Sequence, residues 1–153
     1  MKDTIQTYWE HFRSSRPITS LPDQPDDTFA FGNTPEMADR LGALVVRGVK
    51  TATTSAVWAY RVGEKMPQVG YCSIVLSGDG KPLCIIETTE VQERSFAEVD
   101  AAFAYAEGEG DRSLAYWREA HREFFSKTLP DVGRVFDETM PVLCERFRVV
   151  YSV

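Results

Sequence analysis

The stretch NTPEMADRLGALVVRGVKTATTS, residues 33–55, predicts a helix that leads directly into a strand. Thr34 suits the N-cap position, and Pro35 suits the first helical position, where its missing N–H costs nothing. Gly48 is a natural C-terminal stop. Apolar residues at helical spacing form the expected buried stripe: Met37, Leu41, Leu44 and Val45. The run 50–55 is rich in β-forming residues and follows the stop directly, so we expect it to be extended.

Strand and helix patterns are interleaved over the rest of the chain but do not follow a βαβ rhythm. Helices are expected at 3–14, 95–106 and 113–128, and strands at 71–76, 82–91 and 141–153. Sheets of this kind usually curl into a small mixed β-barrel with surrounding helices, which predicts the α+β class. The proline- and aspartate-rich arm after the first helix is too short to separate two domains. We therefore expect one structural unit, with an N-terminal helix and arm (1–28) packed on the main domain (29–153).

The composition fits a globular domain with a sizeable core. The chain has 153 residues, of which 43% are hydrophobic and 26% charged, and its net charge is −6. This charge argues against a broad surface that coats DNA or RNA, and leaves a small local basic patch open. The N-terminus lacks a signal-peptide core, and no apolar run approaches membrane-spanning length, so no membrane association is expected.

The cysteines and the missing motifs narrow the chemistry. Cys72, Cys84 and Cys144 are odd in number, form no CxxC and lie in apolar, strand-like runs, which favours reduced buried thiols and a cytoplasmic location. The sequence contains no GxGxxG, P-loop, GxSxG or HExxH motif and no zinc-ligand spacing. No cofactor and no metal are therefore expected.

Lys50 is the first candidate for chemistry, because it follows a helix-ending glycine and precedes three threonines within four residues. Such a lysine can bind an anion or, if partly desolvated, serve as a base that activates a hydroxyl. The alternative is a solvated lysine at a helix C-terminus, where positive charge is favoured anyway. In a regular strand Lys50 and Thr53 point to opposite faces, so they converge only if the backbone turns there.

The run AEGEGDRS places Glu107, Glu109 and Asp111 on alternate positions. Three like charges at this spacing need a cation or a solvated turn. A calcium loop is excluded, because Arg112 stands where its glycine is required and Arg118 where its last glutamate is required. The alternative is a corner between two helices, in which the glycines make the turn and Asp111 or Ser113 caps the next helix.

Two further carboxylates, Glu87 and Glu145, alternate in phase with apolar strand residues. If those strand faces are internal, each needs a partner, such as Lys50 or an arginine, because a buried unpaired carboxylate is costly. Exposure at a sheet edge is the open alternative.

Basic and aromatic residues gather in the last predicted helix, where Arg118 and Arg122 lie one turn apart near Trp117 and His121, with Arg112 just before it. Arginine beside aromatic rings suits phosphate and base contact. A solvated helix face with its own glutamates is the alternative, and His121 is interpreted as a packed helix residue.

The stretch FGNTPEMADRLGALVVRGVKTATTS resembles the ASCH domain, the activating-signal-cointegrator homology domain of the PUA-like superfamily. The resemblance continues through PQVGYCSIVL, CIIETTEV, AFAYAEGEGDRSLAYWREAHREFF and MPVLCERFRVVY, and covers about Phe29 to Tyr151. It is closest to the bacterial stand-alone members. It implies a β-barrel surrounded by helices, a cleft between barrel and helices, and RNA, a nucleoside or a nucleotide as the partner.

The resemblance also implies a site. Some small ASCH proteins hydrolyse the amide of N4-acylated cytidines with a lysine, a threonine three residues later and a glutamate, which match Lys50, Thr53 and Glu109. In that form Thr53 attacks, Lys50 accepts its proton, and Glu109 orients Lys50 or shuttles the proton. Another bacterial member is a ribonuclease that also uses the lysine, and eukaryotic members bind nucleic acid. A metal-independent hydrolase and a non-catalytic binding module both remain open.

Within this interpretation Glu109 faces Lys50, while Glu107 and Asp111 are left to solvent, turn and capping roles. The residues expected to contact substrate are Gly48, Thr51, Tyr60, Glu87, Arg112, Arg118, Arg122 and Ser126.

Overall fold

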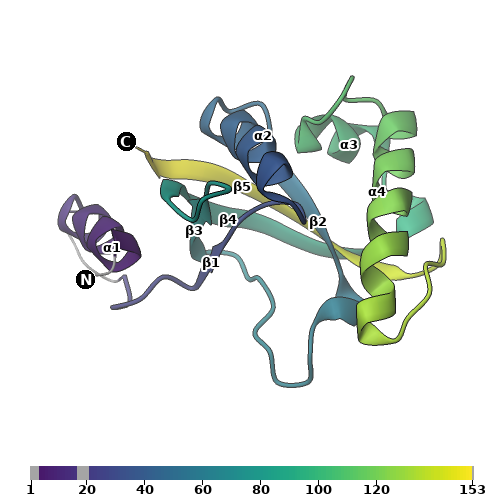
Figure 1. Cartoon of the computed structure of the whole chain (residues 1–153), viewed down its shortest axis with the longest axis horizontal. Helices are drawn as coiled ribbons and strands as arrows, with labels where there is room; N and C mark the ends of the chain where they lie inside the picture. The colour runs from purple at the N-terminus through teal and green to yellow at the C-terminus, as the bar shows by residue number, and fades with distance from the viewer. Residues whose placement is uncertain (1–3, 17–20, 153) are drawn as a thin grey trace.

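A computed structural model describes residues 4–16 and 21–152, and a curled five-stranded sheet forms its centre (Figure 1). The strands are β1 (Asp27–Phe29), β2 (Ala52–Ala56), β3 (Cys72–Leu76), β4 (Pro82–Ser95) and β5 (Pro141–Ser152). Their order is β1-β3-β4-β5-β2; β1 pairs with β3 in parallel, and all other neighbours are antiparallel. The long β4–β5 pair contains register shifts, which bend and twist a sheet. The predicted α+β class with a curled sheet is confirmed.

Four α-helices lie around the described sheet: α1 (Thr4–Ser14), α2 (Pro35–Val46), α3 (Ala101–Glu107) and α4 (Leu114–Thr128). Figure 1 shows α1 at one end of the sheet, α2 above it, and α3 and α4 together at the other end. The helix expected from residue 95 is split in two. Ser95 and Glu98 form the predicted type of reciprocal cap, but they cap a 3₁₀ turn, and Val99 is extended, so Asp100 starts α3 anew.

The short strand β1 was not predicted, because it lies at the end of the polar arm. Its formation depends on β3: the Asp26 carboxylate accepts the Cys72 N–H at 2.9 Å, and the Asp26 N–H donates to the Cys72 carbonyl at 3.0 Å. Residues 17–20 of that arm lie outside the described residues.

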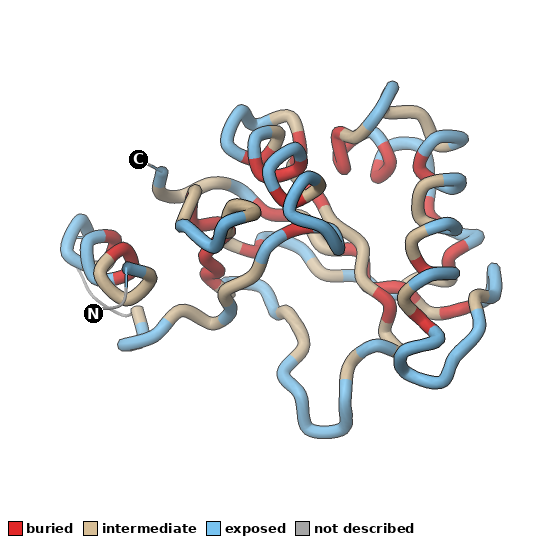
Figure 2. Tube along the Cα trace, viewed as in Figure 1, coloured by how far each residue is buried: buried red, intermediate tan, exposed pale blue. Residues whose placement is uncertain are grey.

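Buried side chains form three apolar clusters along the sheet. Figure 2 marks every buried residue in red along the backbone trace. One joins α3 and α4 to β2 and β5, and includes Phe96, Trp117 and Phe125. A second lies under α2, where Leu41 and Val45 are buried as the stripe predicts. The clusters hold α2 and α4 against neighbouring parts of the sheet.

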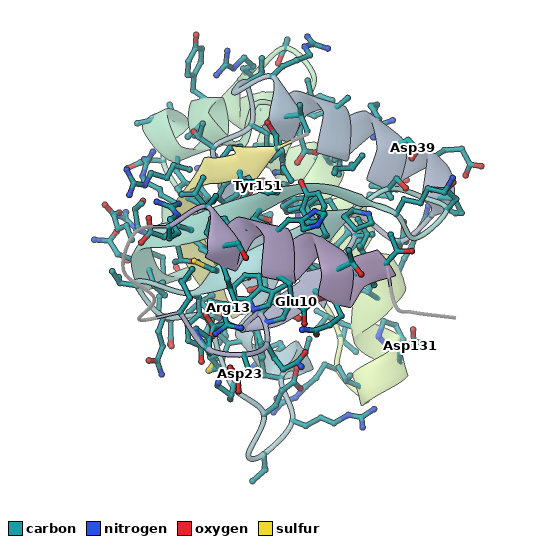
Figure 3. The ribbon with its side chains drawn as sticks, turned by 90° about the vertical axis from the view of Figure 1, so that its left-hand side faces the viewer. Glu10, Arg13, Asp23, Asp39, Asp131 and Tyr151 are labelled. Carbon is teal, nitrogen blue, oxygen red and sulfur yellow. The ribbon has the colours of Figure 1, made fainter. Side chains whose placement is uncertain are left out.

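The third cluster attaches α1, through Tyr8, Trp9 and Phe12, to β3 and β4. The Trp9 indole donates to the Pro22 carbonyl at 3.1 Å, and Arg13 pairs with Asp23 at 3.3 Å; Figure 3 labels Arg13 with Asp23 below it. Within the described residues, no helix is long and apolar enough to cross a membrane.

Candidate functional site

The turn after α2, at Val49 and Lys50, packs directly against the corner after α3, at Gly108, and this contact creates the site. The Lys50 N–H donates to the Leu44 carbonyl at 3.1 Å, so the chain turns sharply before β2 starts. Gly108 adopts φ 76 in the opposing corner, where a Cβ would lie 2.6 Å from the Val49 oxygen and 2.9 Å from the Lys50 Cα. Only a glycine fits this close approach, which brings the carboxylates on both sides of it to Lys50.

Lys50 is 1% exposed, and its ammonium group is saturated with acceptors. Its Nζ donates to the Ala52 carbonyl at 2.8 Å, to Glu107 Oε1 at 2.7 Å and to Glu109 Oε2 at 2.9 Å. The Phe31 ring lies 5.3 Å away. Lys50 is therefore a buried cation between two carboxylates, and the alternative of a solvated lysine is wrong.

Glu107 is also 1% exposed, which corrects its expected place in solvent. Its second oxygen, Oε2, accepts the Thr54 hydroxyl at 2.5 Å and the Trp117 indole N–H at 2.8 Å, and lies 3.3 Å from His121 Nε2. A buried carboxylate needs such partners, because burial without them is costly. Asp111 is exposed, as expected, and accepts the Ser113 N–H, but the cap of α4 is Ser113, whose hydroxyl accepts the Tyr116 N–H at 3.0 Å.

Burial and pairing act in opposite directions on these groups. Burial alone would lower the pKa of Lys50, but Glu107 and Glu109 raise it above its ordinary value. Burial alone would raise the pKa of Glu107, but Lys50 and His121 hold it well below its usual range. Both groups are thus charged at neutral pH, and Lys50 is a poor proton acceptor there.

Glu109 differs from Glu107 in its freedom. Its side chain is 17% exposed, and Lys50 is the one hydrogen-bond partner of its carboxylate among residues 4–16 and 21–152. It lines a pocket with a volume of about 110 Å³ together with Lys50, Thr53 and His121. Lys50 and Thr53 thus share a pocket, because β2 starts only at Ala52, so Lys50 lies before the regular alternation of the strand and not within the extended run expected from residue 50.

The pocket has an apolar and aromatic wall and a cation at its rim. The wall residues come from the β1–α2 segment and from α2 and α4: Phe31, Met37, Leu41, Tyr116, Ala120 and Phe124. Arg40 also lines the pocket; it is exposed and makes no ion pair within the described part of the chain. Space of this size holds several water molecules, each needing about 10–15 Å³.

The expected substrate contacts do not gather at this pocket. Gly48 is exposed with φ 77 and serves the turn, and Thr51 bonds to the Ala106 carbonyl. Arg112 stacks on Tyr105 and donates to the Tyr105 and Val49 carbonyls, so it fastens the corner to the α2 turn.

The remaining expected contacts also lie elsewhere. Arg118 reaches the Ala97 carbonyl at 3.5 Å, Arg122 pairs with Glu138 at 3.0 Å, and Ser126 is exposed. Glu87 pairs with Arg148 at 2.7 Å, which satisfies the predicted need for an arginine partner.

Tyr60 and Glu145 line a separate pocket of about 280 Å³ beside β1. The Tyr60 and Ser55 hydroxyls are 3.0 Å apart, and Glu145 accepts the Thr88 hydroxyl at 2.5 Å. Burial raises the pKa of Glu145. The ion pair expected between Glu145 and Lys50 or an arginine is not found within residues 4–16 and 21–152. Among the described residues, no group of three His, Cys, Asp or Glu side chains converges as metal ligands.

Replacing Gly108 by alanine should lower the free energy of unfolding by more than the ~1–2 kcal/mol that a left-handed residue other than glycine costs, because the new Cβ also meets the Val49 and Lys50 backbone. Urea unfolding measures this. The matched control is Gly63→Ala, since Gly63 has φ 85 with no atom within 4 Å of its added Cβ. Equal losses in both variants would show that the close approach is absent.

The fold and the pocket between sheet and helices define a PUA-like α+β domain. A sequence model of the ASCH domain matches residues 27–151, and the chain belongs to the ASCH family. It is similar to the crystal structure of an ASCH domain from Lactobacillus crispatus JV V101, with 39% identity, a TM-score of 0.88 and coverage of 99% of this chain and 96% of that one.

A second similar structure is a protein of Enterococcus faecalis V583, with 36% identity, a TM-score of 0.89 and coverage of 99% and 91%. Comparison with curated proteins gives no match. The predicted family is confirmed by these matches.

Proposed function

We propose that this ASCH-domain protein is a hydrolase that binds the base of an acylated nucleoside or of a short RNA in the Lys50 pocket and works without a metal. The observation that carries the proposal is a buried ammonium group bonded to the carboxylate of Glu109, with Lys50, Glu109 and Thr53 lining the same pocket. The proposed catalytic residues are Lys50, Thr53 and Glu109. Aromatic side chains in the pocket wall suit stacking on a flat base.

The amide reaction follows from these groups, with one change of role. Because the pKa of Lys50 is raised, Glu109 rather than Lys50 takes the Thr53 proton as the oxygen attacks the acyl carbon. Lys50 stays protonated, and the N–H that it donates to Glu109 turns to the acyl oxygen once Glu109 has taken the proton, which stabilises the negative charge that develops there. The C–N bond then breaks, the leaving amine takes the proton from Glu109, and water hydrolyses the acyl-threonine ester.

RNA cleavage is the second candidate, and the position of Arg40 favours it. A cation at the rim suits a phosphate that stays outside while the base enters. The ribose 2′-hydroxyl would attack phosphorus, Glu109 would take its proton and return it to the departing 5′-oxygen, and Lys50 would stabilise the charge on the phosphoryl oxygens. A cyclic phosphate and a free 5′-hydroxyl are the products.

Incubation with a panel of N4-acylated cytidines and short RNAs, with and without EDTA, tests both reactions. We expect turnover of one substrate class that EDTA leaves unchanged and that Lys50→Met and Glu109→Gln strongly reduce. Binding without turnover would support the non-catalytic binding module instead. Activity lost in EDTA and restored by Mg²⁺ would overturn the metal-independent mechanism.

Arg40→Ala should weaken the binding of a nucleoside 5′-monophosphate at least about tenfold and leave the parent nucleoside unaffected, since a hydrogen bond to a charged group contributes about 1.5–3 kcal/mol. Isothermal titration calorimetry at low salt measures both ligands. Arg47→Ala is the control, because Arg47 is also exposed at the end of α2 but does not line the pocket. Equal loss for both ligands would show that Arg40 does not contact the phosphate.

A further inference from the structure

His121 lies at the back of the pocket, with both of its ring nitrogens against oxygen atoms. Its Nδ1 lies 2.9 Å from the Trp117 carbonyl oxygen, one helical turn earlier on α4. Its Nε2 lies 3.3 Å from Glu107 Oε2, the carboxylate oxygen that Lys50 does not use. The ring stacks on the Trp117 indole with centroids 4.3 Å apart, and the side chain is 12% exposed. The ring is thus held in one orientation.

These contacts determine which protons the ring carries. A carbonyl oxygen only accepts, so Nδ1 carries a hydrogen. A carboxylate that already accepts the Lys50 ammonium and the Trp117 indole is ionised and also only accepts, so its 3.3 Å contact with Nε2 is favourable only when Nε2 carries a hydrogen too. A neutral ring would turn a lone pair towards one of these two oxygens, the Trp117 carbonyl oxygen or the Glu107 carboxylate, depending on its tautomer. The geometry therefore favours the imidazolium form.

We infer that His121 is a positioning residue: as an imidazolium, it holds Glu107 from the side opposite Lys50 and so leaves the Lys50 ammonium available to Glu109 and the ligand. The cluster then contains two cations, Lys50 and His121, and two carboxylates, Glu107 and Glu109. If His121 loses its proton, the cluster has one excess negative charge. Lys50 must then balance Glu107 alone, and the pocket repels an anionic ligand or oxyanion.

The surroundings of His121 support this charge state. Burial alone would lower the pKa of His121, but Glu107 and then Glu109 raise it. Strand β2 presents the neutral Thr54 to the same carboxylate.

The other cations near this cluster do not replace His121. From α2, Arg40 lines the same pocket at its exposed rim, and on α4 the two arginines that flank His121 in sequence contact Ala97 and Glu138 instead. Among the residues that the structure describes, Lys50 and His121 are therefore the two cationic side chains in contact with the Glu107 carboxylate.

For activity the inference rests on the proposed function. Turnover should fall as the pH rises through the pKa of His121, because the imidazolium is the working form. His121→Gln keeps a donor to Glu107 but cannot titrate, so it should show the low alkaline turnover at every pH. If His121 were merely structural, the turnover of His121→Gln would not match that of the wild type at alkaline pH.

The imidazole ¹⁵N spectrum of the free protein tests the inference without any substrate. The chain has two histidines, and His11 is exposed on α1, so His11→Gln assigns both signals. We expect both nitrogens of His121 to be protonated at pH 7 and the ring to titrate above the ordinary value of about 6.5. An unprotonated Nε2 at pH 7 would overturn the inference, while the proposed hydrolase would remain open to its own assay.

Variants of single carboxylates test whether Glu107 is the group that raises the pKa of His121. Glu107→Gln should lower the pKa of His121 by about 1–3 pH units, as expected when an opposite charge within 4–6 Å is removed. Glu123→Gln is the matched control, since Glu123 is an exposed carboxylate on the same helix that pairs with Lys127. If Glu107→Gln does not fold, the wild-type spectrum alone decides. A folded Glu107→Gln protein with an unchanged His121 pKa would overturn the inference.

Discussion

Lys50→Met should lower the free energy of unfolding by about 3–5 kcal/mol at neutral pH, because the substitution leaves Glu107 buried without its main counter-ion. Methionine fills a similar volume, so the loss reports the charge rather than a cavity. Thr54, Trp117 and His121 still bond to Glu107, but none of them replaces the ammonium at 2.7 Å. Urea unfolding followed by circular dichroism measures the change.

The pH dependence of this loss follows from the sign of the Glu107 pKa shift. In the wild type that pKa is depressed, so its stabilising effect is complete above the unfolded value of about 4.3 and is lost only as the pH falls towards the folded pKa. Without Lys50, burial should raise the folded pKa of Glu107, and acid should neutralise it. The difference between variant and wild type should therefore shrink from pH 7 to pH 4.

Two comparisons make the measurement specific. Lys127→Met removes an exposed lysine that pairs with Glu123 at 3.1 Å, and should change stability by less than about 1 kcal/mol. The double variant Lys50→Met/Glu107→Gln should be more stable than Lys50→Met alone, because it no longer buries a carboxylate that has lost its main counter-ion. A Lys50→Met protein as stable as the wild type at pH 7 would show that the buried ion pair does not form.

Local signals made part of the fold predictable. The α2–β2 segment was predicted because its cap, its first-turn proline, its apolar stripe and its terminal glycine all lie within residues 34–55. Strand β1 has no comparable local signal, since it exists through pairing with β3, which is distant in sequence. The split between the 3₁₀ turn and α3 depends on Val99, which is extended and buried in the core.

The burial of charged site residues was harder to predict. Glu107, between an alanine and a glycine, reads as part of a solvated turn, and its burial depends on how closely Gly108 approaches the turn after α2. A signal was present in the helical spacing. Glu107 follows Phe103 by four residues and so continues the apolar face of α3, and Arg40 follows Met37 by three residues on α2. A charged residue in phase with an apolar stripe indicates a buried or pocket-facing charge.

Glu107 and Glu109 both bond to Lys50 but differ in environment, so replacing each of them by glutamine should have a different effect. Glu107 is buried, has donors on both oxygens and carries stability. Glu109 is partly exposed, faces the pocket and is bonded through one oxygen to Lys50. The corner that carries both residues therefore separates a buried structural carboxylate from the carboxylate that we propose as the base.

Glu109→Gln should accordingly reduce turnover by about 10²–10⁴-fold, the contribution typical of a positioned general base, because an amide cannot take the proton of the attacking hydroxyl. Its free energy of unfolding should change by about 1 kcal/mol or less, since Lys50 stays paired with Glu107 and no buried charge is left alone. Steady-state kinetics on the substrate class found in the panel, together with urea unfolding, measures both effects. Glu119→Gln, an exposed carboxylate on α4 outside the pocket, should leave both quantities unchanged. Turnover within threefold of the wild type in a folded Glu109→Gln protein would remove Glu109 from the mechanism and leave the hydroxyl without its proposed base.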